Sequence, residues 1–381
     1  MDPTPRAASC LRLTAWDEEA VIAAARDLRA RIGGADLLVA FASVDYRPHL
    51  ADFVEILQVE GHARRVIGCS SDSLISTGQE DENATGFTAL ALQVPGMKVC
   101  SWVIDETFQV PRDRPDGGAW LILGHPARLN ARFLLEDLNT LYPGTPVFGG
   151  MASGGWDAES IFHFHDGTDA TEAAGIAVHL SGVKVTGIVS QGCQPVGEPY
   201  TITRVEEDVV YSVGGRPAYE VLSETFDKLP DKDKPAAQAG NLMAGIAASE
   251  YIHDYQRGDF LVRNILGGDP ASGAIKIGAH PRVGQTLQFQ LRESGAADED
   301  LRQRCAEKLL QDGVPVAALL FICGGRGQRL FGVGNHDAGL IAETFGAVPL
   351  SGFFANGEFG PVAGHNFLHG YTASAALIYP A

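Results

Sequence analysis

The chain has 381 residues, 45% of them hydrophobic and 20% charged, which is typical of a globular protein and excludes a largely disordered one. Its 29 Lys and Arg residues and 47 Asp and Glu residues give a formal net charge of -18 at pH 7. Such a surface repels phosphate backbones and anionic lipids, and no run of Lys or Arg forms a basic patch. We therefore expect neither nucleic acid nor a membrane as a partner.

The cysteines and the N-terminus predict the compartment. Residues 1–16 contain no apolar core of a signal peptide, and no later apolar run reaches the length of a membrane helix. Six cysteines are scattered along the chain without a CxxC pair, which predicts reduced thiols and neither a disulfide framework nor a zinc site. We expect a cytoplasmic protein without a cofactor.

The first part of the chain alternates helical and strand patterns. Thr14 is a candidate N-cap for an amphipathic helix that ends at Ile32, before two glycines. A short apolar run over 35–43 predicts a buried strand, Pro48 can open a helix that closes at Gly61, and 65–68 predicts a second strand. Residues 79–85 read as a polar loop, after which 86–94 and 98–104 alternate like two neighbouring antiparallel strands.

This order of elements returns twice. The second copy has an apolar strand at 119–124, a helix over 129–141, a strand ending in Gly149-Gly150, and a hairpin over 175–180 and 184–190. The third copy starts at 316–325, continues through a helix around 340–345 and a strand at 348–352, and ends with 371–379. Repeated strand–helix–strand–hairpin units predict an α/β (α+β) fold of two related domains with mixed and antiparallel sheets.

Between the second and third copies the pattern changes. A polar strand over 202–213 leads to a helix over 217–226 and a charged, proline-bounded surface loop over 227–235. Strands are predicted at 261–268, 274–279 and 286–293, and a surface helix at 298–311. We place the domain boundary here, with a lead-in helix in 1–34, one domain in 35–215 and a second domain in 216–381.

The glycine turn after the second strand of each copy is the first candidate site. The turns read GCSSDSL from Gly68, GMASGGW from Gly150 and GFFANGE from Gly352. Glycine lets the backbone approach a ligand closely, and a turn at a strand end can aim N–H groups inward. The alternative is a bend that the fold requires. Polar side chains of these turns are the candidates, namely Cys69, Ser70, Ser71, Ser153, Asn356 and Glu358.

A second candidate site follows the third apolar strand. Cys323 and Arg326 stand in a glycine-rich CGGRG stretch, where arginine can bind a carboxylate with its fork of donors. If Arg326 and Glu358 project into one cleft, the cation and the anion suit a small zwitterion such as an amino acid. The alternative is a salt bridge that only ties the two turns together.

The third candidate site is HNFLHGYT, with His365, His369 and Thr372. Two histidines four residues apart would share one face of a helix, as in a zinc site. Gly364, Gly370 and the strand pattern that follows argue against a helix, so we expect no metal. His163 and His165 alternate in FHFHD, where we expect a polar strand face.

Taken together, CGGRG, PLSGFFANGEFGPV and HNFLHGYTASAAL resemble the C-terminal half of the FIST family (F-box and intracellular signal transduction), and VIGCSSD and PVFGGMAS resemble its N-terminal half. The similarity covers the chain from about residue 35 onward. Ser73 and Leu74 stand where the family has Gly and Glu, so the C-terminal site should matter more. The resemblance implies a sensory module for small ligands, amino acids among those proposed, with a downstream signalling protein as a further partner.

Our first hypothesis is therefore a cytoplasmic small-ligand sensor in which the ligand changes the arrangement of the two domains. The predicted ligand-binding residues are Cys323, Arg326, Asn356, Glu358, His365, His369, Thr372, Cys69, Ser70, Ser71 and Ser153. One alternative is an enzyme with Cys323 as the nucleophile and His365 or His369 as the base. The other alternative is a protein-interaction scaffold that binds no ligand.

Overall fold

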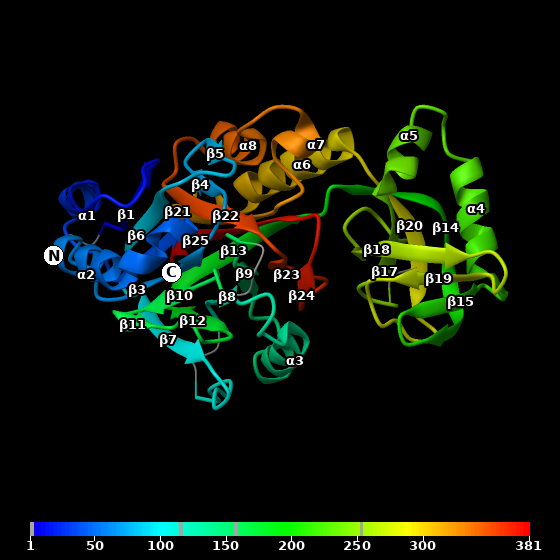
Figure 1. The fold of residues 1–381 in the computed structure, drawn as a ribbon, viewed down its shortest axis with the longest axis horizontal. Coiled ribbons are helices and arrows are strands. Elements are labelled where there is room, and N and C mark those ends of the chain that lie inside the picture. The colour runs from blue at the N-terminus through cyan, green and yellow to red at the C-terminus, as the bar shows by residue number, and fades with distance from the viewer. Residues whose placement is uncertain (1–3, 114–116, 156–158, 252–253) are drawn as a thin grey trace. The chain divides into compact units, whose positions relative to one another are not determined.

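The computed structural model describes residues 4–113, 117–155, 159–251 and 254–381 (Figure 1). The chain forms two compact units, the first made of residues 1–189 and 301–381 and the second of residues 190–300. Helices and strands interleave in both units, so the predicted α/β class is confirmed. The expected division at 215/216 falls inside the second unit, because residues on both sides of it belong to one hydrogen-bonded sheet.

Three pairs of parallel strands form the centre of unit 1, and each pair is joined by a crossover connection that contains a helix. They are β2 (Leu37–Ala42), α2 (Leu50–Glu60) and β3 (Val66–Ser70); β8 (Ala119–Gly124), α3 (Ala131–Leu141) and β9 (Val147–Met151); β21 (Ala317–Cys323), α8 (His336–Phe345) and β22 (Leu350–Ala355). Nearly every residue of these strands is buried, which explains why they read as continuous apolar runs. The three strand–helix–strand segments lie where the repeats were expected. That the segments are copies of one another stays a prediction.

Each parallel pair belongs to a six-stranded mixed sheet. The first sheet is ordered β1-β6-β2-β3-β10-β11, the second β24-β23-β9-β8-β12-β7, and the third β13-β25-β21-β22-β4-β5. Their other strands are β1 (Arg6–Arg12), β4 (Leu74–Ser76), β5 (Gln79–Asp81), β6 (Phe87–Gln93), β7 (Lys98–Ile104), β10 (His163–His165), β11 (Thr168–Asp169), β12 (Gly175–Ser181), β13 (Val183–Ser190), β23 (Glu358–Val362), β24 (His365–His369) and β25 (Ala373–Pro380).

The sheets exchange strands between the two halves of the sequence. β4 and β5 come from the N-terminal half but extend the third sheet beside β22, and β23 and β24 come from the C-terminal half but extend the second sheet beside β9. Figure 1 shows blue β4 and β5 next to orange β22. Phe41, Phe321 and Phe353 pack together in the core, with ring centroids 4.7 to 6.1 Å apart. The two halves therefore share one core.

Both predicted hairpins are wrong in their pairing. β6 pairs with β1 and β2, whereas β7, after a short turn at Gly96, pairs with β12 in another sheet. β12 and β13 are likewise adjacent in sequence, separated at Gly182, and lie in different sheets. In each case both edges of the first strand are already occupied, so the chain turns a corner into the next sheet.

The N-terminal helix α1 (Glu18–Ile32) starts later than expected. Asp17, not Thr14, is the N-cap, since its carboxylate accepts the Ala20 N–H, and Gly33 ends the helix in the left-handed region. A short 3-10 segment, η1 (Val44–His49), precedes α2. The predicted polar loop over 79–85 contains β5.

Unit 2 is built on a sheet ordered β14-β20-β17-β18-β19-β15-β16. The strands predicted at 261–268, 274–279 and 286–293 are present, and the first two pair antiparallel. The elements are β14 (Cys193–Glu206), β15 (Val209–Val213), β16 (Arg216–Pro217), α4 (Ala218–Asp227), α5 (Lys234–Ala236), η2 (Ala237–Asn241), β17 (Leu242–Ala247), β18 (Phe260–Asp269), β19 (Ala274–Ile277) and β20 (Thr286–Arg292). Helix α6 (Ser294–Asp312) leads from unit 2 back to unit 1, where α7 (Gln328–Phe331) follows β21.

Candidate functional site

The three glycine turns meet in unit 1 at the carboxyl ends of β3, β9 and β22. The Ser70 hydroxyl donates to the Ser153 carbonyl (2.8 Å), and the Ser153 hydroxyl donates to the Phe354 carbonyl (2.6 Å). The Phe354 N–H in turn donates to the Ser73 carbonyl (3.2 Å). We call residues 70–73, 151–154 and 354–357 the strand-end site. Ligands of α/β proteins commonly bind outside the carboxyl ends of parallel strands.

Ser153 is at the centre of this site. Its hydroxyl also lies 3.2 Å from the Ser71 hydroxyl and 3.4 Å from an Asp72 carboxylate oxygen. Ser70, Ser71 and Ser153 are buried, whereas Asp72 and Asn356 are exposed, and the Asn356 amide donates to the Ala152 carbonyl (3.0 Å). Four predicted residues are thus brought together, namely the buried Ser70, Ser71 and Ser153 and the exposed Asn356.

Glycines permit this close approach. A Cβ at Gly150 would lie 2.8 Å from the Ala355 Cβ, and one at Gly154, whose φ is +127°, would lie 2.8 Å from a Val44 methyl group. Such separations are shorter than van der Waals contact, so a larger residue would push the turns apart. The glycines are required by packing between the turns, which sequence spacing alone does not show.

A second group of predicted residues adjoins the site. Glu358 lies opposite His369 in the β23–β24 pair, and the Thr372 N–H donates to the Glu358 carboxylate (3.2 Å). The Thr372 carbonyl accepts the Cys323 N–H (2.9 Å). His369, buried like Glu358 and Thr372, places Nε2 2.9 Å from the Gly360 carbonyl, which makes Nε2 the protonated nitrogen. Cys323, Glu358, His369 and Thr372 therefore form one cluster.

His365 is exposed at the other end of β24, opposite Val362, and is not part of this cluster. The prediction that the segment from His365 to His369 is not helical is confirmed, since these residues form a strand.

The structure places Arg326 in a buried ion pair with Asp337. It is fully buried and binds Asp337 with two contacts, Nε to Oδ2 at 2.6 Å and Nη2 to Oδ1 at 2.9 Å, and its guanidinium lies 5.3 Å from the centre of the Phe331 ring. Burial alone would raise the pKa of Asp337, but the Arg326 cation outweighs burial and lowers that pKa to about 2. Arg326 therefore has a salt-bridge partner, Asp337, that was not considered from the sequence.

A second carboxylate lies beside this ion pair, and no sequence pattern indicated it. Glu80 on β5 is buried, and its Oε1 accepts the Ala338 N–H at the start of α8 (2.7 Å). Burial, and then the negative charge of Asp337, raise the pKa of Glu80 to about 7. Its neighbour Glu82 accepts the Gln328 N–H (2.6 Å) but is less buried. Both glutamates lie in or beside the segment predicted as a polar loop.

Two further buried histidines lie next to the Ser70 turn. His163 is fully buried, and its ring centre lies 6.1 Å from that of His125, which follows β8. Burial, and then His125, lower the pKa of His163 to about 3, so its imidazole is neutral. His163 of β10 therefore lies in the core and not on the polar strand face that was expected. Cys69, opposite His163, is also buried, which raises the pKa of its thiol well above the usual range.

These positions define an α/β protein whose two sequence halves meet at a polar strand-end site. Residues 36–216 match the model of the FIST N domain, and residues 218–361 match the model of the FIST C domain. The chain belongs to the FIST family, whose domains generally serve as sensory domains in signal transduction.

Full-length relatives are found in mycobacteria. An uncharacterized protein of Mycobacterium tuberculosis is 38% identical over 353 residues, which cover 90% of each chain. An uncharacterized protein of Mycobacterium bovis is 36% identical over 372 residues, which cover 94% of this chain and 95% of the relative. F-box only protein 22 of Homo sapiens is 28% identical over 128 residues, or 29% of this chain and 32% of that protein. No described helix is long and apolar enough to cross a membrane.

Proposed function

We propose that this protein is a sensor for a small polar metabolite, such as an amino acid, that binds at the strand-end site. The observation that carries the proposal is the meeting of three turns around Ser153, with buried hydroxyl groups beneath the exposed Asp72 and Asn356. The Asp72 carboxylate can bind an ammonium group, and the amide of Asn356 can donate to a carboxylate. Since Arg326 is held by Asp337, it is not part of this proposal.

We further propose that the output is a change in the arrangement of the two units. Thr372, in the cluster beside the site, directly precedes β25, and β25 is hydrogen-bonded to β13. β13 ends at Ser190, where unit 2 begins. A Cβ at Gly360 would lie 2.6 Å from Val189, so β23 packs tightly against the end of β13. This contiguous packing supports coupling between the ligand and the link to unit 2.

A thermal-shift screen with amino acids and organic acids tests the site. A ligand at a hundred times its Kd stabilises the folded state by about 2.7 kcal/mol, which raises Tm by several degrees. Asp72→Asn and Asn356→Ala should reduce the shift, whereas Asp231→Asn, at an exposed aspartate of unit 2, should leave it unchanged. A ligand whose shift survives both site variants would show that the strand-end site is not where it binds.

One observation favours a second candidate function, an enzyme with Cys323 as the nucleophile. Cys323 is half-buried, and its backbone is tied through Thr372 to the cluster of Glu358 and His369. A thiol next to a histidine base is the arrangement of a nucleophile, so this function requires the His369 ring to reach the Cys323 thiol. Labelling with iodoacetamide near neutral pH separates the two functions, with buried Cys69 as the internal control. Labelling of Cys323 faster than that of a free thiol favours the enzyme, and slow labelling excludes it.

A further inference from the structure

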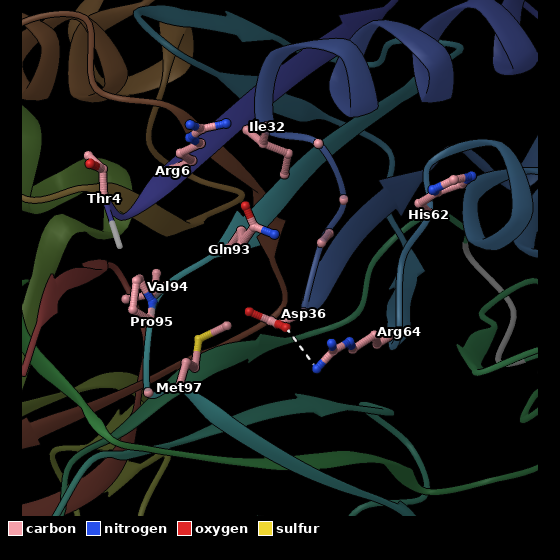
Figure 2. A pocket seen from close by; sticks show the side chains of 14 residues that line it. Thr4, Arg6, Ile32, Asp36, His62, Arg64, Gln93, Val94, Pro95 and Met97 are labelled. Atoms are coloured by element: carbon pink, nitrogen blue, oxygen red, sulfur yellow. Dashed lines mark ion pairs between the residues drawn. The ribbon is translucent and has the colours of Figure 1, made fainter. Parts of the chain in front are cut away.

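A second hollow lies in unit 1, at the amino ends of β2 and β3 (Figure 2). Its volume is about 770 Å³, within the range of small-molecule sites. The walls are the end of α1, the start of β1, the residues before β2 and β3, and the turn between β6 and β7. The strand-end site is at the carboxyl ends of these parallel strands, so the hollow is a separate feature.

The charged groups of the hollow differ from those of the chain as a whole. Among the described residues, Arg6, Arg64 and His62 line it together with the carboxylate of Asp36, although the chain has a net charge of -18. Arg64 approaches Asp36 to 3.4 Å, and their side chains are 76% and 23% exposed. An exposed ion pair of this kind contributes little to stability. Arg64 can therefore turn its fork of donors to a ligand carboxylate at small cost.

The remaining walls offer acceptors and apolar contact. Figure 2 shows the side chains of Asp36, Gln93 and Met97 on neighbouring walls, with Arg6 and Arg64 beyond them on either side. The Asp36 carboxylate and the Gln93 amide oxygen can accept hydrogen bonds from hydroxyl groups. Gly33 has a φ of +87°, and a Cβ there would meet no atom within 4 Å, so this wall borders open space.

We propose that the hollow binds a small hydroxy acid, with Arg64 holding its carboxylate and Asp36 and Gln93 accepting from hydroxyls. A ligand with carboxylates alone would face the Asp36 charge without a compensating donor. The hydroxyl group is therefore the feature that the site selects. This site is additional to the sensory function proposed above and does not depend on it.

Isothermal titration of the full chain with malate and succinate, at equal ionic strength, tests the proposal. Malate should bind, and succinate, which lacks the hydroxyl, should bind about tenfold more weakly. Arg64→Gln should weaken malate binding by about tenfold or more, because a charge-assisted pair is lost. Arg65→Gln is the matched control, since the neighbouring Arg65 pairs with Asp166 and does not line the hollow.

Asp36→Asn should bring the affinities for malate and succinate closer together, since its neutral amide oxygen accepts from a hydroxyl more weakly than a carboxylate does and no longer repels a ligand carboxylate. Melting temperatures of all variants show whether they fold, and the exposure of Arg64 predicts that they do. Absence of malate binding at millimolar concentration, or equal malate affinity in Arg64→Gln and Arg65→Gln, would overturn the proposal. Asp72→Asn, at the strand-end site, should leave malate binding unchanged, so the two sites are tested separately.

Discussion

Glu80 provides the sharpest test of the electrostatics of unit 1. The substitution Glu80→Gln keeps an oxygen that can accept the Ala338 N–H, now 2.7 Å away, but removes the negative charge near Asp337. The pKa of Glu80 is about 7 in the folded protein, against a reference value of 4.5. Because the folded pKa is the higher one, the folded state binds the proton more tightly than the unfolded state does.

The sign of the pH dependence follows directly. The contribution of Glu80 to the free energy of unfolding is fully present below about pH 4.5, decreases as the pH rises, and is lost above about pH 7. The rise of the Glu80 pKa from 4.5 to about 7 corresponds to about 3 kcal/mol. Glu80→Gln should therefore stabilise the protein by up to about 3 kcal/mol near pH 8 and by much less near pH 5.

Urea unfolding between about pH 5 and pH 8 measures this difference, and hydrogen exchange of residues 74–82 and 336–345 assigns it to unit 1. Glu82→Gln is the matched control, because it removes a less buried charge from the adjacent segment and should leave the pH dependence unchanged. If Glu80→Gln has the same pH dependence as the parent protein, or is less stable near pH 8, Glu80 is not the titrating group and this reasoning fails.

Other perturbations test the packing around the candidate site. Arg326→Ala or Asp337→Asn should each destabilise unit 1 by about 3–5 kcal/mol in urea unfolding, since each leaves a buried group without its partner; a cost under about 1 kcal/mol would contradict the buried pair. Gly150→Ala should cost about 1–3 kcal/mol by overpacking, measured by the same method. Gly339→Ala, inside α8 with open space around it, should instead stabilise by about 0.5–1 kcal/mol, and equal effects of the two glycine variants would refute the packing argument.

Local elements of the fold were predictable because they depend on nearby residues. The apolar run of β21, for example, is long enough to identify a buried strand by itself. Pairing between strands depends on distant residues, and no local pattern indicated that β7 would join β12 or that β4 would join β22. The same limit applies to Arg326, because no local pattern indicated that it would bind the carboxylate of Asp337.

The residue types of the candidate site were predictable from the sequence, whereas the hydrogen bonds between its residues were not. Repetition of the glycine turn singled out Ser70, Ser153 and Asn356, and the structure brings all three together. The buried pair of His125 and His163 next to the site was not predicted, because the strand that contains His163 alternates as an exposed strand would. Leu74, on β4, packs opposite Phe353 on β22 in the core that the two sequence halves share.

The exchange of strands explains why ligand contacts should concentrate at one place. Ser73 immediately precedes β4, the first strand that the N-terminal half contributes to the third sheet, and Glu358 begins β23, the strand that the C-terminal half contributes to the second sheet. Both crossings lie at the strand-end site or directly beside it. A molecule bound there would contact both halves of the sequence at the points where they interlock. Its binding energy would therefore stabilise both exchanges together.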